Sequence, residues 1–399
     1  MTVAAHIAAQ LRSAEQVLAH FDGSEPFPVY LKAFFRMNSK FGSRDRRQVS
    51  AFCYACQRLG HALADQPLRE RILAGYLLCV DDSAPVMEAV RPEWLEQCGR
   101  PLDQRLAFLS ETYSDWSIDE VFPLPEAISA DVDKAAFIRS HFQQPGLFIR
   151  IRPGQTARVK HQLDKAGIAY RPAGAHGLAM DNATKLETLG VPDQDYVVQD
   201  LSSQVTASFF PDRSTLPPNP LVWDACAGSG GKTIMAMDIL TRAQLYVSDI
   251  RPSILQNLRQ RFRHARIQPQ QMAVIDLTQT PDAGQREFFP GKGFDLVIAD
   301  VPCSGSGTWG RDPWMLAAFH PASLERYAQR QKAIVDRLVP NIASQGYLLY
   351  ITCSVYAAEN EAVADHIESK GKLQRIRQQI IPGYTQRADS MFAALFRRP

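Results

Sequence analysis

The sequence lacks long hydrophobic runs and an excess of charge of either sign. None of its apolar runs approaches the roughly 18 residues that a membrane-spanning helix needs. The first residues include His6, Arg12 and Glu15, where a signal peptide would need an uninterrupted apolar stretch. The 44 Lys and Arg residues against 42 Asp and Glu residues leave a formal net charge of +2. We therefore expect no membrane anchor, and a polyanionic partner would have to be bound by local basic patches.

Paired cysteines are also lacking. The chain has seven cysteines, an odd number, and no second pair completes the spacing of a zinc site. Cys53 and Cys56 form a single C-x-x-C pair, which we interpret as packed helical cysteines rather than a metal or redox site. This usage suits a reducing compartment better than a disulfide framework, so we expect a cytoplasmic protein without a metal.

The length and composition provide enough material for more than one buried core. The chain has 399 residues, of which 45% are hydrophobic and 22% charged. Apolar residues at helical spacing predict an all-helical module over residues 1–125. After a proline-containing linker, residues 126–200 alternate short helices and strands, which predicts a small α/β module. In its first strand Arg150 and Arg152 share one face, and we expect both to face the solvent.

Residues 201–399 carry the pattern of a doubly wound α/β domain. Short apolar runs alternate with helical segments, and the runs cover residues 221–224, 245–249, 272–276, 294–300 and 347–352. This alternation predicts a parallel sheet with helices on its faces. Ligands of such sheets bind at the carboxyl ends of the strands, so the residues that follow each run are the candidates for function.

A glycine-rich turn follows the first of these runs and opens a helix. Its residues are Cys226, Ala227, Gly228, Ser229, Gly230, Gly231 and Lys232. Glycines let the backbone approach a nucleotide-like ligand closely. A Walker phosphate loop would need glycine at position 226 and a dinucleotide-binding turn would need it at position 233, so the sequence disfavours an ATPase and a dehydrogenase.

Two further runs end in an acidic residue, Asp249 and Asp276. Carboxylates at these places could accept hydrogen bonds from ribose hydroxyls and an adenine amine. Since no phosphate-binding lysines are needed for that purpose, the pattern indicates S-adenosylmethionine as the ligand. Either aspartate could instead cap the helix that follows it.

The last two runs lead into loops that contain cysteine. Asp300 precedes Pro302 and Cys303, and Cys353 follows the final run. A single cysteine is usually a small buried apolar residue. Two cysteines at the mouth of one presumed crevice, each beside loop-forming residues, indicate chemistry instead.

These segments resemble the RNA cytosine-5 methyltransferases of the Fmu/Sun/RsmB type. The family's motifs D-A-C-A-A-P-G-G-K-T, D-x-P-C-S-G and T-C-S with E-N-E are similar to residues 224–233, 300–305, 352–354 and 359–361, and residues 199–204 resemble the segment that precedes its catalytic domain. The resemblance spans about residues 126–399. The sequence differs from the family's motifs at Gly228 and Ser229, where the family commonly has Ala-Pro, and at Arg152, where it commonly has Asn.

The resemblance implies a fold and a domain order. We expect a Rossmann-like S-adenosylmethionine-dependent methyltransferase domain over residues 201–399. A small α/β module that positions RNA would precede it over residues 126–200. Residues 42–47 resemble part of the NusB-like helical domain that many members carry, so a NusB-like module is expected over residues 1–125.

The resemblance also implies covalent catalysis on cytosine. Ring carbon 5 is a poor nucleophile, and addition of a thiolate to carbon 6 activates it. The family's pattern assigns this attack to Cys353, stabilisation near ring nitrogen 3 to Asp300, and release of the product to Cys303. Lys232 is a candidate source of positive field, which would favour the thiolate. Asp300, Lys232, Asp249, Asp276 and the glycine-rich turn make up the expected cofactor site.

The sequence leaves the substrate open. Structured RNA, above all 16S ribosomal RNA, is the expected substrate, and transfer RNA is the alternative. A DNA cytosine-5 methyltransferase would use the Pro-Cys residue Cys303 as its nucleophile, and a non-catalytic RNA-binding assembly factor would need neither cysteine. We expect a monomer.

Overall fold

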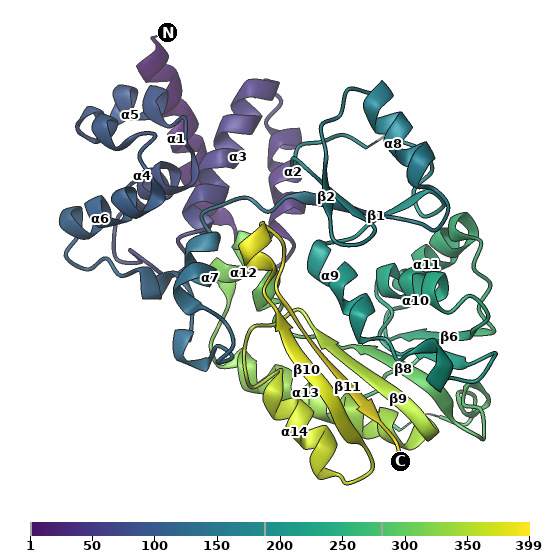
Figure 1. Ribbon diagram of the computed structural model, residues 1–399. Coiled ribbons are helices and arrows are strands. Elements are labelled where there is room, and N and C mark those ends of the chain that lie inside the picture. Colours follow the sequence, from purple (N-terminus) through teal and green to yellow (C-terminus); the bar gives the residue numbers. More distant parts are fainter. Residues whose placement is uncertain (1, 187–188, 281) are drawn as a thin grey trace. The chain divides into compact units, whose positions relative to one another are not determined.

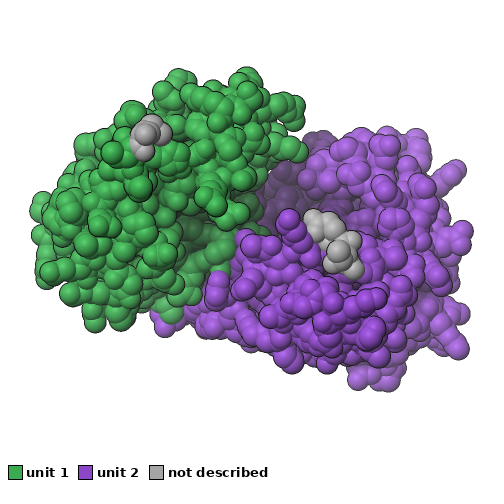
Figure 2. Space-filling model, turned by 90° about the horizontal axis from the view of Figure 1, so that it is seen from above, with its two compact units in different colours: residues 1–126, 134–144, 309–321 green, residues 127–133, 145–308, 322–399 purple. Residues whose placement is uncertain are grey.

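The computed structural model describes residues 2–186, 189–280 and 282–399. The chain forms two compact units, coloured separately in Figure 2. Unit 1 consists of residues 1–126, 134–144 and 309–321, and unit 2 of residues 127–133, 145–308 and 322–399. The sequence predicted three consecutive domains. In the structure, short segments such as residues 127–133 and 309–321 belong to a different unit from the residues on either side of them. Within unit 2, separating residues 126–200 from the rest stays a prediction.

Unit 1 is helical, as the apolar spacing predicts. Its α-helices are α1 (Val3–His20), α2 (Phe27–Met37), α3 (Ser43–Gln57), α4 (Leu68–Cys79), α5 (Ala84–Val90), α6 (Leu102–Thr112), α7 (Lys134–Ser140) and α12 (Pro313–Ala318). On α1, Ile7, Leu11 and Ala14 share one buried face, which is the amphipathic pattern of a core-facing helix. Cys53 and Cys56 are buried in α3, where they pack as apolar residues. No group of side chains that could hold a metal ion occurs among the described residues.

Residues distant in the sequence complete the core of unit 1. The ring of Phe122 lies 5.0 Å from that of Phe137 and 5.1 Å from that of Trp309, measured between centroids. Trp309 is fully buried. A segment between two strands of unit 2 thus belongs to the helical unit, because its aromatic side chains are buried there. The described residues form no helix long and apolar enough to cross a membrane.

Unit 2 contains two sheets and the remaining α-helices (Figure 1). The helices are α8 (Thr156–Lys165), α9 (Leu201–Val205), α10 (Gly231–Ile239), α11 (Pro252–Ala265), α13 (Ser323–Leu338) and α14 (Glu361–Ser369). The strands are β1 (Leu147–Ile151), β2 (Arg171–Ala173), β3 (Gly177–Met180), β4 (Tyr196–Val198), β5 (Leu221–Asp224), β6 (Gln244–Asp249), β7 (Gln271–Val274), β8 (Phe294–Asp300), β9 (Ile342–Thr352), β10 (Gln374–Ile381) and β11 (Met391–Arg397). The small sheet has the order β2-β3-β1-β4, and the large sheet has the order β10-β11-β9-β8-β5-β6-β7.

The large sheet is doubly wound and Rossmann-like, as predicted, but it is not wholly parallel. Strands β7, β6, β5, β8 and β9 pair in parallel, whereas β11 pairs antiparallel with both β9 and β10. The prediction of a parallel sheet missed the last two strands. Strand β10 is largely exposed and rich in polar residues, while β11 is buried along nearly its whole length. Neither therefore has the clean alternation that marks a strand in a sequence.

Helices cover both faces of this sheet. Side chains alternate along each strand, and this alternation decides which face each of them points to. Val222 and Leu349 lie in a core cluster with Met235 of α10. Trp223 points to the other face, where its ring lies 5.1 Å from that of Phe294. Strands buried on both faces read as continuous apolar runs, which is why their positions were predictable.

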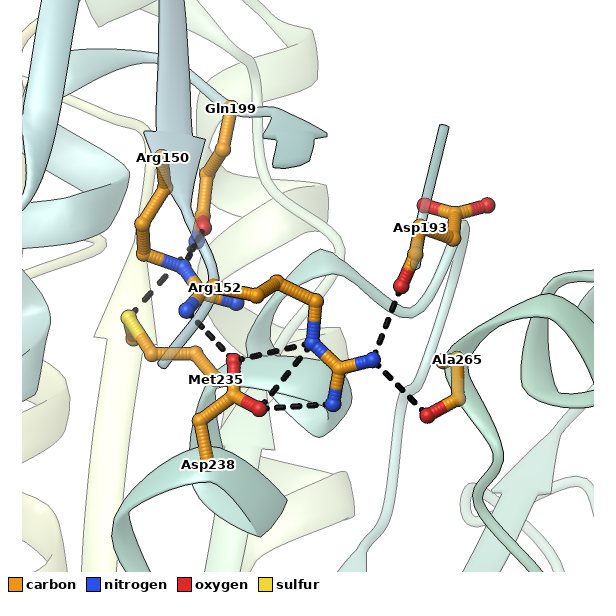
Figure 3. A network of polar contacts seen from close by, with 7 residues as sticks. All are labelled: Arg150, Arg152, Asp193, Gln199, Met235, Asp238 and Ala265. Carbon is orange, nitrogen blue, oxygen red and sulfur yellow. Dashed lines mark hydrogen bonds and ion pairs between the residues drawn. The ribbon is translucent and has the colours of Figure 1, made fainter. Parts of the chain in front are cut away.

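The small sheet corrects the prediction for Arg150 and Arg152. Both arginines are bound to the carboxylate of Asp238 on α10, with N···O distances of 2.6 Å and 2.7 Å, as Figure 3 shows. The side chain of Arg150 is 7% exposed and that of Arg152 14%. The strand face that alternation assigns to solvent is covered here by α10, which supplies a buried carboxylate to both charges.

Candidate active site

The carboxyl ends of neighbouring parallel strands form one edge of the large sheet. Strands β6, β5 and β8 lie in that order and end at Asp249, Asp224 and Asp300. Strand β9 lies next to β8, and Cys353 follows its last residue. The fold therefore brings most of the predicted site residues to the edge where doubly wound sheets bind ligands.

The glycine-rich turn needs glycine at defined positions. Gly228 and Gly230 have φ angles of 51° and 83°, in the left-handed region. At Gly230 an added Cβ would also lie 2.1 Å from Cδ1 of Leu258. Helix α10 begins at the next residue, Gly231, so the first backbone N–H groups of the helix face this end of the sheet.

The other residues of the turn are held by the backbone around them. The Ala227 N–H donates to the carbonyl of Ser248 at 3.0 Å, and the Ser229 carbonyl accepts from the guanidinium of Arg261. Cys226 lies in the turn, and burial raises the pKa of its thiol. In its protonated form, the Cys226 side chain behaves as a small apolar residue.

Asp249 anchors the turn. Its Oδ2 accepts from the N–H of Gly228 at 3.0 Å, and its Oδ1 accepts from the N–H of Arg251 at 2.9 Å. Burial alone would raise the pKa of Asp249, but its hydrogen bonds with Arg251 and Gly228 lower it overall. The carboxylate is thus kept charged beside the turn. Its predicted contact with a cofactor ribose stays a prediction.

Asp276 follows β7 and caps the next turn. Its Oδ1 accepts from the backbone N–H of Thr278 at 2.9 Å and from the Thr278 hydroxyl at 2.7 Å. The sequence had left capping of a helix open as the alternative, whereas Asp276 caps a turn. Its side chain is half-buried, and the predicted cofactor contact stays a prediction.

Asp224 is a candidate that the sequence analysis did not single out. Its Oδ2 accepts from the Thr233 hydroxyl at 2.5 Å, whereas its buried Oδ1 has no hydrogen-bond partner within residues 2–186, 189–280 and 282–399. Burial raises the pKa of Asp224 to about 7, and the nearby carboxylates of Asp300 and Asp249 add to this effect. The sequence could have indicated Asp224, because this residue ends an apolar run just as Asp249 does.

Lys232 and Asp300 form an ion pair at the end of β8. The Nζ of Lys232 lies 2.7 Å from Oδ2 of Asp300, and the two side chains are 12% and 32% exposed. Burial would lower the pKa of Lys232, but the charge of Asp300 outweighs it and the pKa is raised. That Lys232 favours a thiolate at Cys353 stays a prediction.

The two predicted catalytic thiols lie side by side. The Sγ atoms of Cys303 and Cys353 are 3.3 Å apart, and both residues are half-buried. The hydrogen bond between them raises the pKa of Cys303, and burial and the charge of Glu359 raise it further. The two thiols are thus brought together at one place, and the separate roles that the sequence assigns to them stay predictions.

The donors and acceptors at this edge fit S-adenosylmethionine. Its sulfonium is positively charged, and its ribose and amine carry hydrogen-bond donors that need acceptors. The buried Oδ1 of Asp224 is such an acceptor, and Asp249 and Asp276 provide others on the neighbouring strands. An added Cβ at Gly228 would find its nearest neighbour only at 4.0 Å, so the turn leaves room for a ligand.

Comparison with known proteins assigns this domain to a family. The model of the family described as 16S rRNA methyltransferase RsmB/F matches residues 215–396. A protein described as probable ribosomal RNA small subunit methyltransferase B, from Synechocystis, is 29% identical over 277 residues, which cover 67% of this chain and 59% of the relative. Ribosomal RNA small subunit methyltransferase B from Xanthomonas campestris is 26% identical over 396 residues, covering 90% of this chain and 87% of the relative.

Solved structures share the fold at low identity. The crystal structure of a protein designated PH0851 covers 99% of this chain and is itself covered to 99%, with a TM-score of 0.68 and 16% identity. NSun6 from Pyrococcus horikoshii covers 68% of this chain and is covered to 99%, with a TM-score of 0.55 and 14% identity. These likenesses confirm the methyltransferase fold over the catalytic part. A NusB-like module in unit 1 stays a prediction.

The family match confirms the predicted enzyme class and, with it, S-adenosylmethionine as the cofactor. It covers the glycine-rich turn, the three strand-end aspartates and both thiols. Residues 215–396 thus match the family described as 16S rRNA methyltransferase RsmB/F, and the chain is similar to ribosomal RNA small subunit methyltransferases B.

Proposed function

We propose that this protein methylates carbon 5 of a cytosine in the RNA of the small ribosomal subunit, by covalent catalysis through Cys353. The observation that carries the proposal is the pair of thiols 3.3 Å apart beside the ion pair of Lys232 and Asp300. Carbon 5 and carbon 6 are adjacent ring atoms, so two thiols at this separation can act on them in turn. The names of the two relatives from Synechocystis and Xanthomonas campestris support ribosomal RNA as the substrate.

The first step is addition of the Cys353 thiolate to carbon 6 of the cytosine. A thiolate is the reactive form, and an ordinary thiol with a pKa of about 8.5 is mostly protonated at neutral pH. We assign to the positive charge of Lys232 the role of favouring this thiolate. Asp300, next to the Pro302 turn, would stabilise the ring after addition in its protonated form, by donating a hydrogen bond to nitrogen 3. S-adenosylmethionine supplies, when bound, the electrophilic methyl group that carbon 5 takes up.

The second step releases the product. The proton on carbon 5 passes to the Cys303 sulfur, which must be a thiolate to accept it. The bond between carbon 6 and Cys353 breaks, its electron pair returns to the Cys353 sulfur, and the ring regains its double bond. Cys303 is the group next to Cys353 that can assist this release, and its raised pKa makes its thiolate a stronger base for the proton. In a DNA cytosine-5 methyltransferase the Pro-Cys residue Cys303 would attack instead.

The substrate must present an unstacked cytosine. A thiol cannot reach carbon 6 of a base inside a closed helix, so the target lies in a single-stranded or loop segment, or is extruded on binding. We further propose a cytoplasmic enzyme, because all seven cysteines are free thiols, as a reducing compartment requires. The monomeric state expected from the sequence is tested by sedimentation.

Methyl transfer to defined nucleic acids tests this proposal. The protein is incubated with S-adenosylmethionine labelled in its methyl group and, separately, with small-subunit ribosomal RNA, small subunits, transfer RNA and DNA. Label in 5-methylcytosine of the small-subunit RNA, absent with Cys353→Ala, is the expected result. Label confined to transfer RNA or to DNA would contradict the proposed substrate. RNA binding without any methylation would favour a non-catalytic assembly factor.

A further inference from the structure

A buried carboxylate lies beneath both thiol-bearing turns. Glu359 is fully buried just before α14, and its Oε1 accepts from the backbone N–H of Ser304 at 2.8 Å. Its Oε2 accepts from the hydroxyls of Ser304 and Ser354, each at 2.5 Å. Ser304 directly follows Cys303, and Ser354 directly follows Cys353. One carboxylate is therefore bonded to the neighbour of each thiol.

A second contact of Glu359 braces the other side of Cys303. The side-chain amide of Gln331, on α13, donates to Glu359 Oε1 at 2.9 Å and to the carbonyl of Pro302 at 3.1 Å. Pro302 precedes Cys303, so the backbone on both sides of this thiol is tied to the same buried group. Burial raises the pKa of Glu359, while the bonds from Ser304, Ser354 and Gln331 oppose that rise.

The next residue, Asn360, holds the turn of Cys353 in the same manner. Its Oδ1 accepts from the Thr352 hydroxyl at 2.5 Å, and its Nδ2 donates to the carbonyl of Ser354 at 3.0 Å. Thr352 and Ser354 flank Cys353 on either side. Asn360 is fully buried and is the N-cap residue of α14, so the start of this helix is joined to the turn.

We propose that Glu359 is a positioning residue that sets the distance between the Cys303 and Cys353 thiols, with Asn360 fixing the Cys353 turn. The proposal rests on the proposed function in one respect, namely that both thiols must act on neighbouring atoms of one ring. Misplacement of a reacting group by about 1 Å costs roughly 100-fold in rate. A carboxylate accepts hydrogen bonds only, and its two oxygens can bind the donors of both turns at once.

The test measures the distance between the thiols without any RNA. Dibromobimane becomes fluorescent when it bridges two thiols that lie close together, and the bridged peptide can be identified by mass spectrometry. In the wild type we expect a bridge between Cys303 and Cys353. In Glu359→Ala the bonds to both serines are lost, and the rate of bridging is expected to fall by roughly tenfold. Methyl transfer is expected to fall by about 100-fold with the affinity for S-adenosylmethionine unchanged.

Two further variants keep the test decisive. Glu359→Gln keeps the shape and one acceptor oxygen, so it is expected to fold and to lie between the wild type and Glu359→Ala in both measurements. Glu361→Gln changes a carboxylate two residues away that bonds to Ser129, and it is expected to leave the bridging rate unchanged. A merely structural role would lower the unfolding temperature of a Glu359 variant without altering bridging in the folded protein.

The outcomes separate this proposal from the proposed function. Slower bridging in folded Glu359 variants supports it, even if the wild type methylates no RNA that is tested. Bridging at the wild-type rate in folded Glu359→Ala overturns it, even if the wild type is an active methyltransferase. If Glu359→Ala does not fold, the same two results in Glu359→Gln decide the question.

Discussion

The sulfur atoms of Cys303 and Cys353 lie 3.3 Å apart although the residues are 50 positions apart in the sequence. The separation follows from the pairing of β8 with β9, in which Asp300 lies opposite Ile351. Both strands run in the same direction and end at the same edge, so each carries one thiol to the same place. The chemistry of the site depends on this register, and a slip of either strand would separate the thiols.

The ion pair of Lys232 and Asp300 is expected to be needed for catalysis. Lys232→Met removes the positive charge to which we assign stabilisation of the thiolate, and it removes the ion-pair partner of Asp300. We expect methyl transfer to fall by roughly 100-fold or more, measured as the initial rate with labelled cofactor. Lys292→Met, at an exposed position, serves as the control. A Lys232→Met enzyme with the activity of this control would show that the charge plays no part.

Asp224 is expected to make the stability of the protein depend on pH. Its pKa is raised by burial to about 7 in the folded protein, against an ordinary value of 3.8. A group with a raised pKa stabilises the fold below its unfolded pKa, and this contribution is lost as the pH rises through the folded pKa. The free energy of unfolding should therefore decline between about pH 4 and pH 7 through this group.

Asp224→Asn removes that titration. Chemical unfolding of the cofactor-free protein, measured from pH 4 to pH 8, should show a smaller decline in the variant than in the wild type. The difference in stability between the two proteins should thus shift in favour of the variant as the pH rises. Parallel curves across this range would mean that Asp224 titrates outside it.

Asp238 is expected to contribute strongly to stability. Asp238→Ala leaves the guanidinium groups of Arg150 and Arg152 without the carboxylate that both of them bind. Loss of one partner of a buried ion pair costs about 3–5 kcal/mol. Urea unfolding measures the effect, and Glu287→Ala, at an exposed position, is the control. A loss no greater than that of the control would show that the two arginines find other partners.

Gly307 is expected to tolerate no side chain. Its N–H donates to the carbonyl of Cys353 at 2.9 Å, and an added Cβ would lie 2.0 Å from the carbonyl oxygen of Ser390. Gly307→Ala should therefore displace the Cys353 turn, destabilise the protein by about 1–3 kcal/mol and reduce methyl transfer. Gly291→Ala meets no atom within 4 Å of its Cβ and should behave as the wild type. Equal stability and activity of the two variants would contradict the described packing.

Much of the catalytic domain was predictable because its strands are buried on both faces. The run at residues 294–300 coincides with β8, and the run at 221–224 coincides with β5. The residues that follow such strands lie at one edge, so the sequence could place Asp300 and both thiols in one site. Asp249 was singled out for the same reason, whereas Asp224, at the end of β5, was not.

What was missed depends on contacts between distant segments. The sequence predicted solvent exposure for Arg150 and Arg152, because nothing local indicates that Asp238 of α10 covers them. The transfer of residues 309–321 to unit 1 likewise depends on the burial of Trp309 against Phe122. Such pairings are set by tertiary packing, which local periodicity does not encode.

The start of helix α3 also depends on a contact between side chain and backbone. The helix α3 begins at Ser43, and its N-cap is Gly42, which has no side chain that could cap it. There the carboxylate of Asp45 accepts from the N–H of Gly42 at 3.2 Å. A charged residue in the first turn therefore bonds to the backbone at this helix start.

The roles of the two thiols are tested most directly by the Cys303→Ala variant. If Cys353 attacks the base and Cys303 assists its release, this variant should accumulate RNA bonded to Cys353. A denaturing gel of the protein expressed in cells should show a shifted band that ribonuclease removes. The band should be absent from the Cys303→Ala, Cys353→Ala double variant. Ribonuclease-sensitive bands in Cys353→Ala but not in Cys303→Ala would reverse the assignment and contradict the account.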